Sequence, residues 1–303
     1  MIEIRRILCP IDFSVFSRHA LEHASAIARR YESEITVLNV CALVPATAYA
    51  PGTPIMPVTV PTSGDLEALL ASMKRFVETE VGLTIPTRYE IGVGDAASEI
   101  LDRAGALPSD LIVMGTHGRS GFERLVLGSV TEKVIHKAAG PVLTVPRPVG
   151  DVVPVPDTLF TRILCAIDFS DTSIHALEYA LSLAQERDAQ LTLVHVVEVM
   201  PAPQSEAAGD VEARALGAYV AAAAEARAEH LQDIVPESAR AYCTIERTMA
   251  IGTPHREILR VAAERDSDLI VLGAHGYGIT QLLFGSTAEQ VVRQARCPVL
   301  TIR

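Results

Sequence analysis

Two glycine-containing segments of the chain have the residue types of an anion-binding loop. In the first, Gly115 and Gly118 end an apolar stretch, nine residues follow, and Gly128-Ser129 opens a stretch with helical periodicity. Glycine at the carboxyl end of a strand lets a ligand approach the backbone, and a helix start offers unpaired N–H groups and a partial positive charge. Ser129 and Thr131 add hydroxyl donors. The pattern predicts a phosphate cradle; the alternative is an ordinary strand-to-helix connection with turn glycines.

An aspartate follows an apolar stretch near the start of each half of the chain, at Asp12 and at Asp168. In a doubly wound sheet the first strand lies beside the switch point, where ligands bind. A carboxylate there accepts hydrogen bonds from a sugar hydroxyl or an exocyclic amine. The alternative role is the N-cap of the following helix, for which Ser14 and Ser17 compete.

These segments occur twice because the chain contains a long internal repeat. Ile7–Ser14 returns as Ile163–Ser170 with one of eight positions changed, and Pro141–Thr144 returns as Pro298–Thr301. A repeat of this length indicates a duplicated domain rather than a solenoid unit, since solenoid repeats run about 20–50 residues. We expect one domain over residues 1–146, a proline-rich linker over 147–158 and a second domain over 159–303.

Short apolar stretches alternate with helical patterns in both halves, which predicts parallel sheets with helices on both faces. The expected strands are 7–11, 35–40, 87–91, 111–114, 142–145, 163–167, 191–196, 241–246, 269–272 and 299–302. The expected helices are 17–31, 64–81, 96–106, 129–137, 173–187, 211–234, 254–264 and 287–294. Proline-rich composition predicts loops over 45–61 and 201–209.

Composition narrows the classes of function. The 303 residues carry a formal net charge of −11 and no Lys/Arg-rich run, which argues against a nucleic-acid partner. No apolar stretch reaches the roughly 18 residues of a membrane span, and no signal peptide is apparent, so we expect no membrane partner and a cytoplasmic location. Five cysteines without a Cys/His ligand spacing predict no metal site, and Cys9 and Cys165 read as buried apolar residues.

With these motifs and their flanks, the whole chain resembles the universal stress protein family in two tandem copies. The resemblance implies two doubly wound domains, each a five-stranded parallel α/β fold of the Rossmann-like, adenine nucleotide α-hydrolase-like kind, and ATP as ligand, with Mg²⁺ a possible companion. It implies adenine and ribose contacts at Asp12 and Val40, and a nucleotide-lining role for Met114 and Gly115. The phosphate-binding residues implied in the first half are Gly118, Arg119, Gly128, Ser129, Val130 and Thr131. The matching residues of the second half are Asp168, Val196, Leu272, Gly273, Gly276, Gly285, Ser286 and Thr287.

The second glycine loop departs from the first in length and charge. Tyr277–Phe284 is one residue shorter than the first loop, and Tyr277 stands where the first loop has Arg119. A deletion of one residue can move a backbone N–H by about 3 Å. We therefore expect the first half to bind a nucleotide more tightly than the second.

Three functions remain open. The resemblance favours an ATP-binding regulatory protein of the stress response. A slow ATPase or self-phosphorylating enzyme at the same site is the alternative. We predict no catalytic residue, and hydrolysis would be slow because the sequence offers no general base aimed at a γ-phosphate. A nucleotide-independent scaffold is the third, although the intact first motif opposes it. We read His117 and His275 as structural. The last strand of each half is an exposed sheet edge, so we expect the two domains to pair within the chain, and we also expect two chains to form a homodimer.

Overall fold

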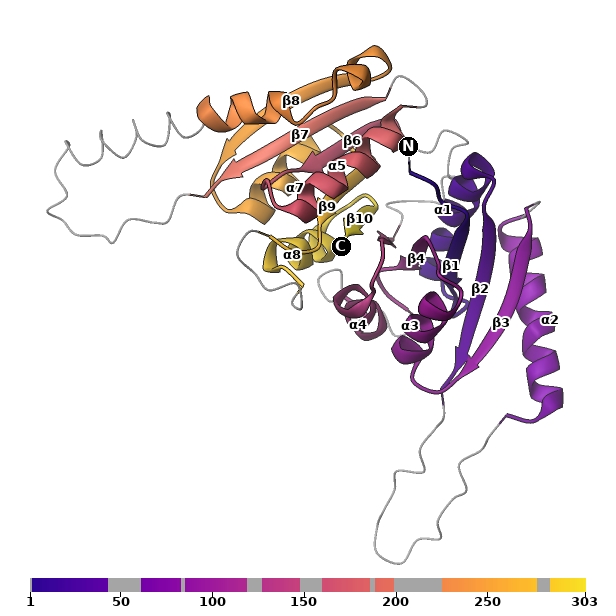
Figure 1. Cartoon of the computed structure of the whole chain (residues 1–303). Coiled ribbons are helices and arrows are strands. Elements are labelled where there is room, and N and C mark those ends of the chain that lie inside the picture. Colours follow the sequence, from indigo (N-terminus) through magenta and orange to yellow (C-terminus); the bar gives the residue numbers. More distant parts are fainter. Residues whose placement is uncertain are drawn as a thin grey trace, which may run out of the picture. The chain divides into compact units, whose positions relative to one another are not determined.

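The computed structural model describes residues 2–42, 61–82, 85–118, 127–147, 160–185, 189–198, 225–276 and 284–303 (Figure 1). The chain divides into two compact units, one within Glu3–Leu159 and one within Phe160–Arg303, called here the first and second half. The expected loops over 45–61 and 201–209 and the expected linker lie almost wholly outside the described residues. Each half is described by itself.

The first half is a parallel sheet in the order β3-β2-β1-β4-β5. Its elements are β1 (Arg6–Pro10), α1 (Val15–Tyr31), β2 (Glu34–Cys41), α2 (Ser63–Glu80), β3 (Thr87–Val93), α3 (Ala96–Ala106), β4 (Leu111–Gly115), α4 (Ser129–Lys137) and β5 (Val142–Val145).

The second half repeats this order as β8-β7-β6-β9-β10. Its elements are β6 (Arg162–Ala166), α5 (Asp171–Ala184), β7 (Gln190–Val197), the 3-10 helix η1 (Glu237–Ala241), β8 (Thr244–Ile251), α7 (Pro254–Glu264), β9 (Leu269–Gly273), α8 (Ser286–Gln294) and β10 (Val299–Ile302). Residues 225–233 are also helical.

The expected fold class, a doubly wound parallel sheet in each half, is confirmed. One expected strand starts too early. Residue Ala241 lies in η1 rather than in a strand, because the Cys243 N–H bonds the carbonyl of Ala239 at 3.3 Å and closes a helical turn instead of pairing with β7. The expected helix over 211–234 is seen over 225–233, and its earlier residues lie outside the described part of the chain.

The core of each half lies around the central strand, which is shielded on both sides of the sheet. Leu8 on β1 pairs with Thr36 and Ile112 on its two neighbours and is fully buried. Cys9 and Cys165 are also fully buried, as expected for small apolar residues, and burial raises the pKa of both thiols.

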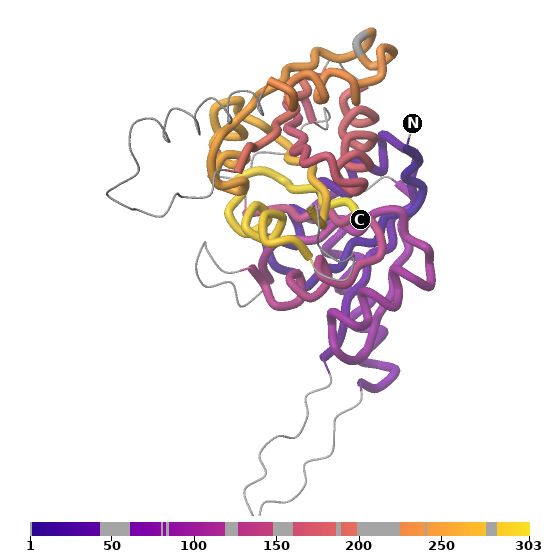
Figure 2. Tube along the Cα trace, turned by 60° about the vertical axis from the view of Figure 1, so that its left-hand side comes forward, coloured from indigo at the N-terminus to yellow at the C-terminus, as the bar shows by residue number. Residues whose placement is uncertain are grey.

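The strand order creates a switch point beside the first strand of each half. Because parallel crossovers are right-handed, α1 and α2 cover one face of the first sheet, and α3 and α4 pack together on the other. Strands distant in the sequence therefore lie side by side, as β6 and β9 do (Figures 1 and 2). Ligands of such sheets bind at the carboxyl ends of the strands flanking this point.

Candidate functional site

The aspartate after the first strand of each half is fixed by the turn that follows it. Asp12 Oδ1 accepts a hydrogen bond of 3.0 Å from the Ser14 N–H, and Asp168 Oδ1 accepts one of 3.0 Å from the Ser170 N–H. Ser14 and Ser170, not the aspartates, are the N-caps of α1 and α5. The capping alternative is therefore taken by the serines, and the carboxylates are held at the carboxyl edge of the sheet.

A phenylalanine in a left-handed backbone conformation anchors each of these turns. Phe13 and Phe169 both have φ 64°, a region that costs a non-glycine residue about 1–3 kcal/mol. Phe13 packs edge-on against Phe76 with 5.4 Å between ring centroids, and Phe169 stacks on His230 at 4.3 Å. Packing of these rings compensates the backbone strain.

The second strand of each half braces the same turn from the side. Asn39 donates to the Ile11 carbonyl at 2.8 Å, and in the second half His195 takes this place, with Nδ1 2.7 Å from the Ile167 carbonyl. A carbonyl only accepts, so Nδ1 of His195 carries the proton. Burial lowers the pKa of His195, and the nearby positive charge of Arg227 adds to the effect.

The glycines that follow β4 and β9 face these aspartates. A Cβ built on Gly118 would lie 2.7 Å from Asp12 Oδ2, and one built on Gly276 would lie 3.0 Å from Asp168 Oδ2. Any side chain at these positions would push the carboxylate or the loop away. The glycine and the aspartate of each half therefore form one unit.

The first glycine of each motif serves the packing of a helix instead. A Cβ on Gly115 would lie 2.8 Å from the Cβ of Phe16, and one on Gly273 would lie 2.7 Å from Thr172 Oγ1. These glycines let the starts of α1 and α5 approach the ends of β4 and β9.

The third glycine starts the helix at the site without any side-chain cap. The N–H of Gly128 donates to the Thr116 carbonyl at 2.8 Å, and that of Gly285 donates to the Ala274 carbonyl at 2.7 Å. Their backbones are extended, with φ −61° and −69°, so close packing rather than left-handed freedom requires glycine. Neither glycine makes a side-chain cap bond, which leaves first-turn N–H groups of α4 and α8 available to an anion.

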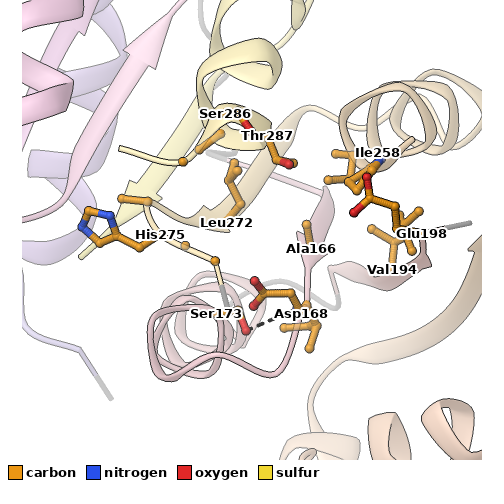
Figure 3. Close-up of a pocket in the computed structure, with 18 residues that line it drawn as sticks. Ala166, Asp168, Ser173, Val194, Glu198, Ile258, Leu272, His275, Ser286 and Thr287 are labelled. Carbon is orange, nitrogen blue, oxygen red and sulfur yellow. Dashed lines mark hydrogen bonds between the residues drawn. The ribbon is translucent and has the colours of Figure 1, made fainter. Parts of the chain in front are cut away.

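In the second half these elements enclose a cavity of ≈ 350 Å³ at the carboxyl ends of β6, β7 and β9 (Figure 3). This volume falls within the range of about 300–1,000 Å³ typical of small-molecule sites. The cavity brings together all eight residues predicted for this half, namely Asp168, Val196, Leu272, Gly273, Gly276, Gly285, Ser286 and Thr287.

The cavity has an apolar wall and a polar edge. Val194, Leu272 and Ile258 supply apolar surface, whereas Ser286 and Thr287 place hydroxyls at the start of α8 (Figure 3). His275 points its ring away from Thr287 (Figure 3), and its carbonyl accepts a 2.6 Å hydrogen bond from Thr172. The backbone, not the imidazole, of this histidine therefore shapes the site.

In the first half, the predicted residues occupy the equivalent strand ends and helix start. They are Asp12, Val40, Met114, Gly115, Gly118, Gly128, Ser129, Val130 and Thr131. Thr131 is buried, and its hydroxyl donates to the Gly115 carbonyl at 2.9 Å, so it also ties α4 to β4. Arg119 lies outside the described residues. Phosphate binding by these residues stays a prediction.

Among the cavity residues that sequence reasoning missed are Ser173, Val194, Glu198 and Ile258. Ser173 lies at the repeat position of Ser17, for which the sequence indicates only a capping role, and Ser173 Oγ accepts a hydrogen bond from the Asp168 N–H at 3.3 Å. Ile258 matches Ile100 in the repeat. Glu198 had no signal, because its counterpart in the first half is Ala42.

Comparisons with known proteins agree with this architecture. The model of the universal stress protein family matches residues 3–146 and 159–303. A universal stress protein of Mycolicibacterium smegmatis is 26% identical over 304 residues, which cover 98% of this chain and 96% of that protein. One from Methanocaldococcus jannaschii is 32% identical over 148 residues, covering 48% of this chain and 84% of that protein.

The solved structures show the same fold. The crystal structure of a universal stress protein from Archaeoglobus fulgidus covers 99% of this chain and 97% of its own, with 24% identity and a TM-score of 0.67.

The sheet order, the switch-point cavity and the glycine-started helices define a Rossmann-like α/β protein with two tandem domains. Together with the two family matches, this shows that the chain belongs to the universal stress protein family. Among the described helices, none is long and apolar enough to cross a membrane.

Proposed function

We propose that this protein is an adenine-nucleotide-binding regulatory protein whose ligand sits at the carboxyl ends of the central strands. The observation that carries the proposal is the second-half cavity, in which the uncapped start of α8 and the Asp168 carboxylate open into one space. A helix start attracts phosphate, and a carboxylate accepts hydrogen bonds from amines and hydroxyls.

The lining fits the parts of an adenine nucleotide. Val194, Val196 and Leu272 offer an apolar surface for a flat base. Ser286 and Thr287 add hydroxyl donors beside the first-turn N–H groups of α8. The ligand would therefore lie with its base over the strands and its phosphate at the helix.

The same geometry in the first half supports a second site there. Asp12 with Gly118, and the uncapped start of α4, repeat the second-half arrangement. The proposed activity is nucleotide binding without rapid hydrolysis. The experiment below distinguishes it from a slow ATPase. Among the described residues, no three His, Cys, Asp or Glu side chains gather as a metal site. The cytoplasmic location and the homodimer stay predictions.

The test is to denature the purified protein, identify the released small molecule by mass spectrometry, and then titrate the emptied protein with ATP by calorimetry. We expect an adenine nucleotide to be released and ATP to bind. Released ADP with steady phosphate production on added ATP would indicate the ATPase instead. If neither calorimetry nor thermal shift detects binding of any nucleotide, the nucleotide-independent scaffold is the function that remains.

A further inference from the structure

The charged side chains that line the second-half cavity are both acidic. Asp168 lies at the end of the first strand of this half and Glu198 directly after β7 (Figure 3). No lysine or arginine is among the described residues that line the cavity. The sequence from Tyr277 to Phe284, which joins Gly276 to Gly285, also contains no lysine or arginine.

The first half differs in each of these respects. Ala42 stands at the repeat position of Glu198, so that acidic side chain is missing. The segment between Gly118 and Gly128 contains Arg119 and Arg124 and one acidic residue, Glu123, so its formal charge is positive, whereas Tyr277–Phe284 has no charged residue. Arginine is the side chain best suited to phosphate groups, because its donors match phosphate oxygens in pairs.

The start of α8 can compensate only part of a polyphosphate charge. A helix N-terminus is equivalent to roughly half an elementary charge, and its effect fades beyond the first turn. Ser286 and Thr287 add donors but no charge. One phosphate fits this capacity, whereas the further phosphates of a triphosphate would meet no lysine or arginine among the described residues that line the cavity.

The two carboxylates favour a ligand rich in neutral donors. The ribose hydroxyls and the exocyclic amine of adenosine donate hydrogen bonds, which carboxylates accept strongly. Asp168 Oδ1 accepts a hydrogen bond from the Ser170 N–H, and Asp168 Oδ2 faces Gly276 at the edge of the cavity. Both carboxylates therefore attract hydroxyl or amine groups.

We propose that the second-half cavity binds adenosine or adenosine monophosphate in preference to the triphosphate, so that the two halves take different nucleotides. This rests on the proposed function. The first half, which has no counterpart of Glu198, is then the half in which we expect the triphosphate to bind.

The test uses hydrogen exchange of the full chain, which reports each half separately without a mutation. Exchange is followed in α4 and α8 while AMP or ATP is titrated, once with EDTA and once with Mg²⁺, since Mg²⁺ can bridge carboxylates and phosphates. In α8 we expect AMP to protect at a concentration about tenfold or more below that of ATP. In α4 we expect ATP to be at least as effective as AMP.

A variant at the cavity isolates the cause. Glu198→Gln removes one acidic charge and keeps a similar shape, so the preference of α8 for AMP over ATP should shrink about fivefold. Glu229→Gln is the matched control, because Glu229 is exposed and outside the lining, and it should leave the ratio unchanged.

The outcomes separate the two proposals. Protection of α8 by ATP as strong as by AMP, with or without Mg²⁺, would overturn the preference and leave nucleotide binding intact. An unchanged ratio in Glu198→Gln would also overturn the electrostatic cause. Absence of protection by every nucleotide in both α4 and α8 would defeat the proposed function itself.

Discussion

At the scale of single residues, the site consists of carboxylates that their own turns hold in place. Asp12 and Asp168 each accept a backbone N–H two residues on, and each faces a glycine of the next loop. The carboxylate is thus oriented before any ligand arrives. Preorganisation of this kind lowers the entropic cost of binding.

Gly118→Ala tests the contact between glycine and aspartate. The new methyl would lie 2.7 Å from Asp12 Oδ2, so we expect the free energy of unfolding to fall by about 1–3 kcal/mol, as in overpacked sites. Chemical denaturation measures the change. Gly105→Ala is the control, since nothing lies within 4 Å of its Cβ position in α3, and it should stabilise by about 0.5–1 kcal/mol. Equal effects of the two substitutions would contradict the packing role of Gly118.

His23 on α1 provides a pH-dependent test of packing. Burial, together with the neighbouring His19, lowers the pKa of His23 from 6.5 to about 4. Between these values the unfolded chain binds a proton that the folded chain does not, so the free energy of unfolding falls as pH falls. The largest loss from this group, complete near pH 4, is about 3 kcal/mol.

His23→Gln removes the titration and keeps an amide to meet the His19 carbonyl, which lies 3.0 Å from Nδ1. Denaturation between pH 4 and 7 should show a flatter pH dependence for the variant. The same slope in both proteins would show that His23 does not set it.

At the scale of elements, the second strand of each half holds the binding turn through one buried polar side chain. Asn39 on β2 and His195 on β7 bond the carbonyl that precedes the aspartate by one residue. The first half makes this hydrogen bond with the amide of Asn39, and the second half makes it with the imidazole of His195. The cluster of His195, Phe169, His230 and Arg227 joins this brace to the helix over 225–233.

The residue at the equivalent position of the first half suggests a substitution that tests the hydrogen bond of His195. His195→Asn copies the first half and should keep the bond to Ile167, at a cost below about 1 kcal/mol. His195→Ala leaves the carbonyl without this donor and should cost about 1–3 kcal/mol. Thermal unfolding at pH 7.5 compares them. Equal destabilisation by both variants would show that the hydrogen bond contributes nothing.

Strands and helices followed from the sequence because buried parallel strands leave uninterrupted apolar stretches and the repeat supplies each pattern twice. The expected bounds of α3, α4 and α7 match those seen. The start of β8 was missed because local bonding in η1 takes precedence over the apolar pattern.

The repeat helped to predict the site but was not sufficient, since Ser173 and Ile258 match Ser17 and Ile100 and were still missed. Asp168, Gly276 and Ser286 have counterparts in the first half, whereas Glu198 has none. The sequence could not show why these positions require glycine, because the close approach of Gly118 to Asp12 and of Gly115 to Phe16 is seen only in the structure.

At the scale of the whole molecule, one fold is used twice with different site chemistry. Both halves keep the strand order, the Asp-Phe-Ser turn and an uncapped helix at the site. They differ in loop length and in charge. A duplicated chain of this kind can keep its stability while one copy changes its ligand.

Stabilisation by ATP should accordingly depend on the first half. A ligand present at 100 times its Kd adds about 2.7 kcal/mol to stability. We expect Gly118→Ala to abolish most of the ATP-induced increase in melting temperature, and Gly276→Ala to leave most of it. The increase is read for each variant against its own ligand-free protein, and equal losses would contradict the expected difference in affinity.

The most direct test of nucleotide binding at the strand ends is a crystal structure of the full chain grown with AMP and a non-hydrolysable ATP analogue. We expect density for a base against Val194 and Leu272, with a phosphate at the start of α8, and a second nucleotide beside Asp12 and Gly118. Nucleotide bound elsewhere, or both positions empty at concentrations that saturate binding in solution, would contradict it.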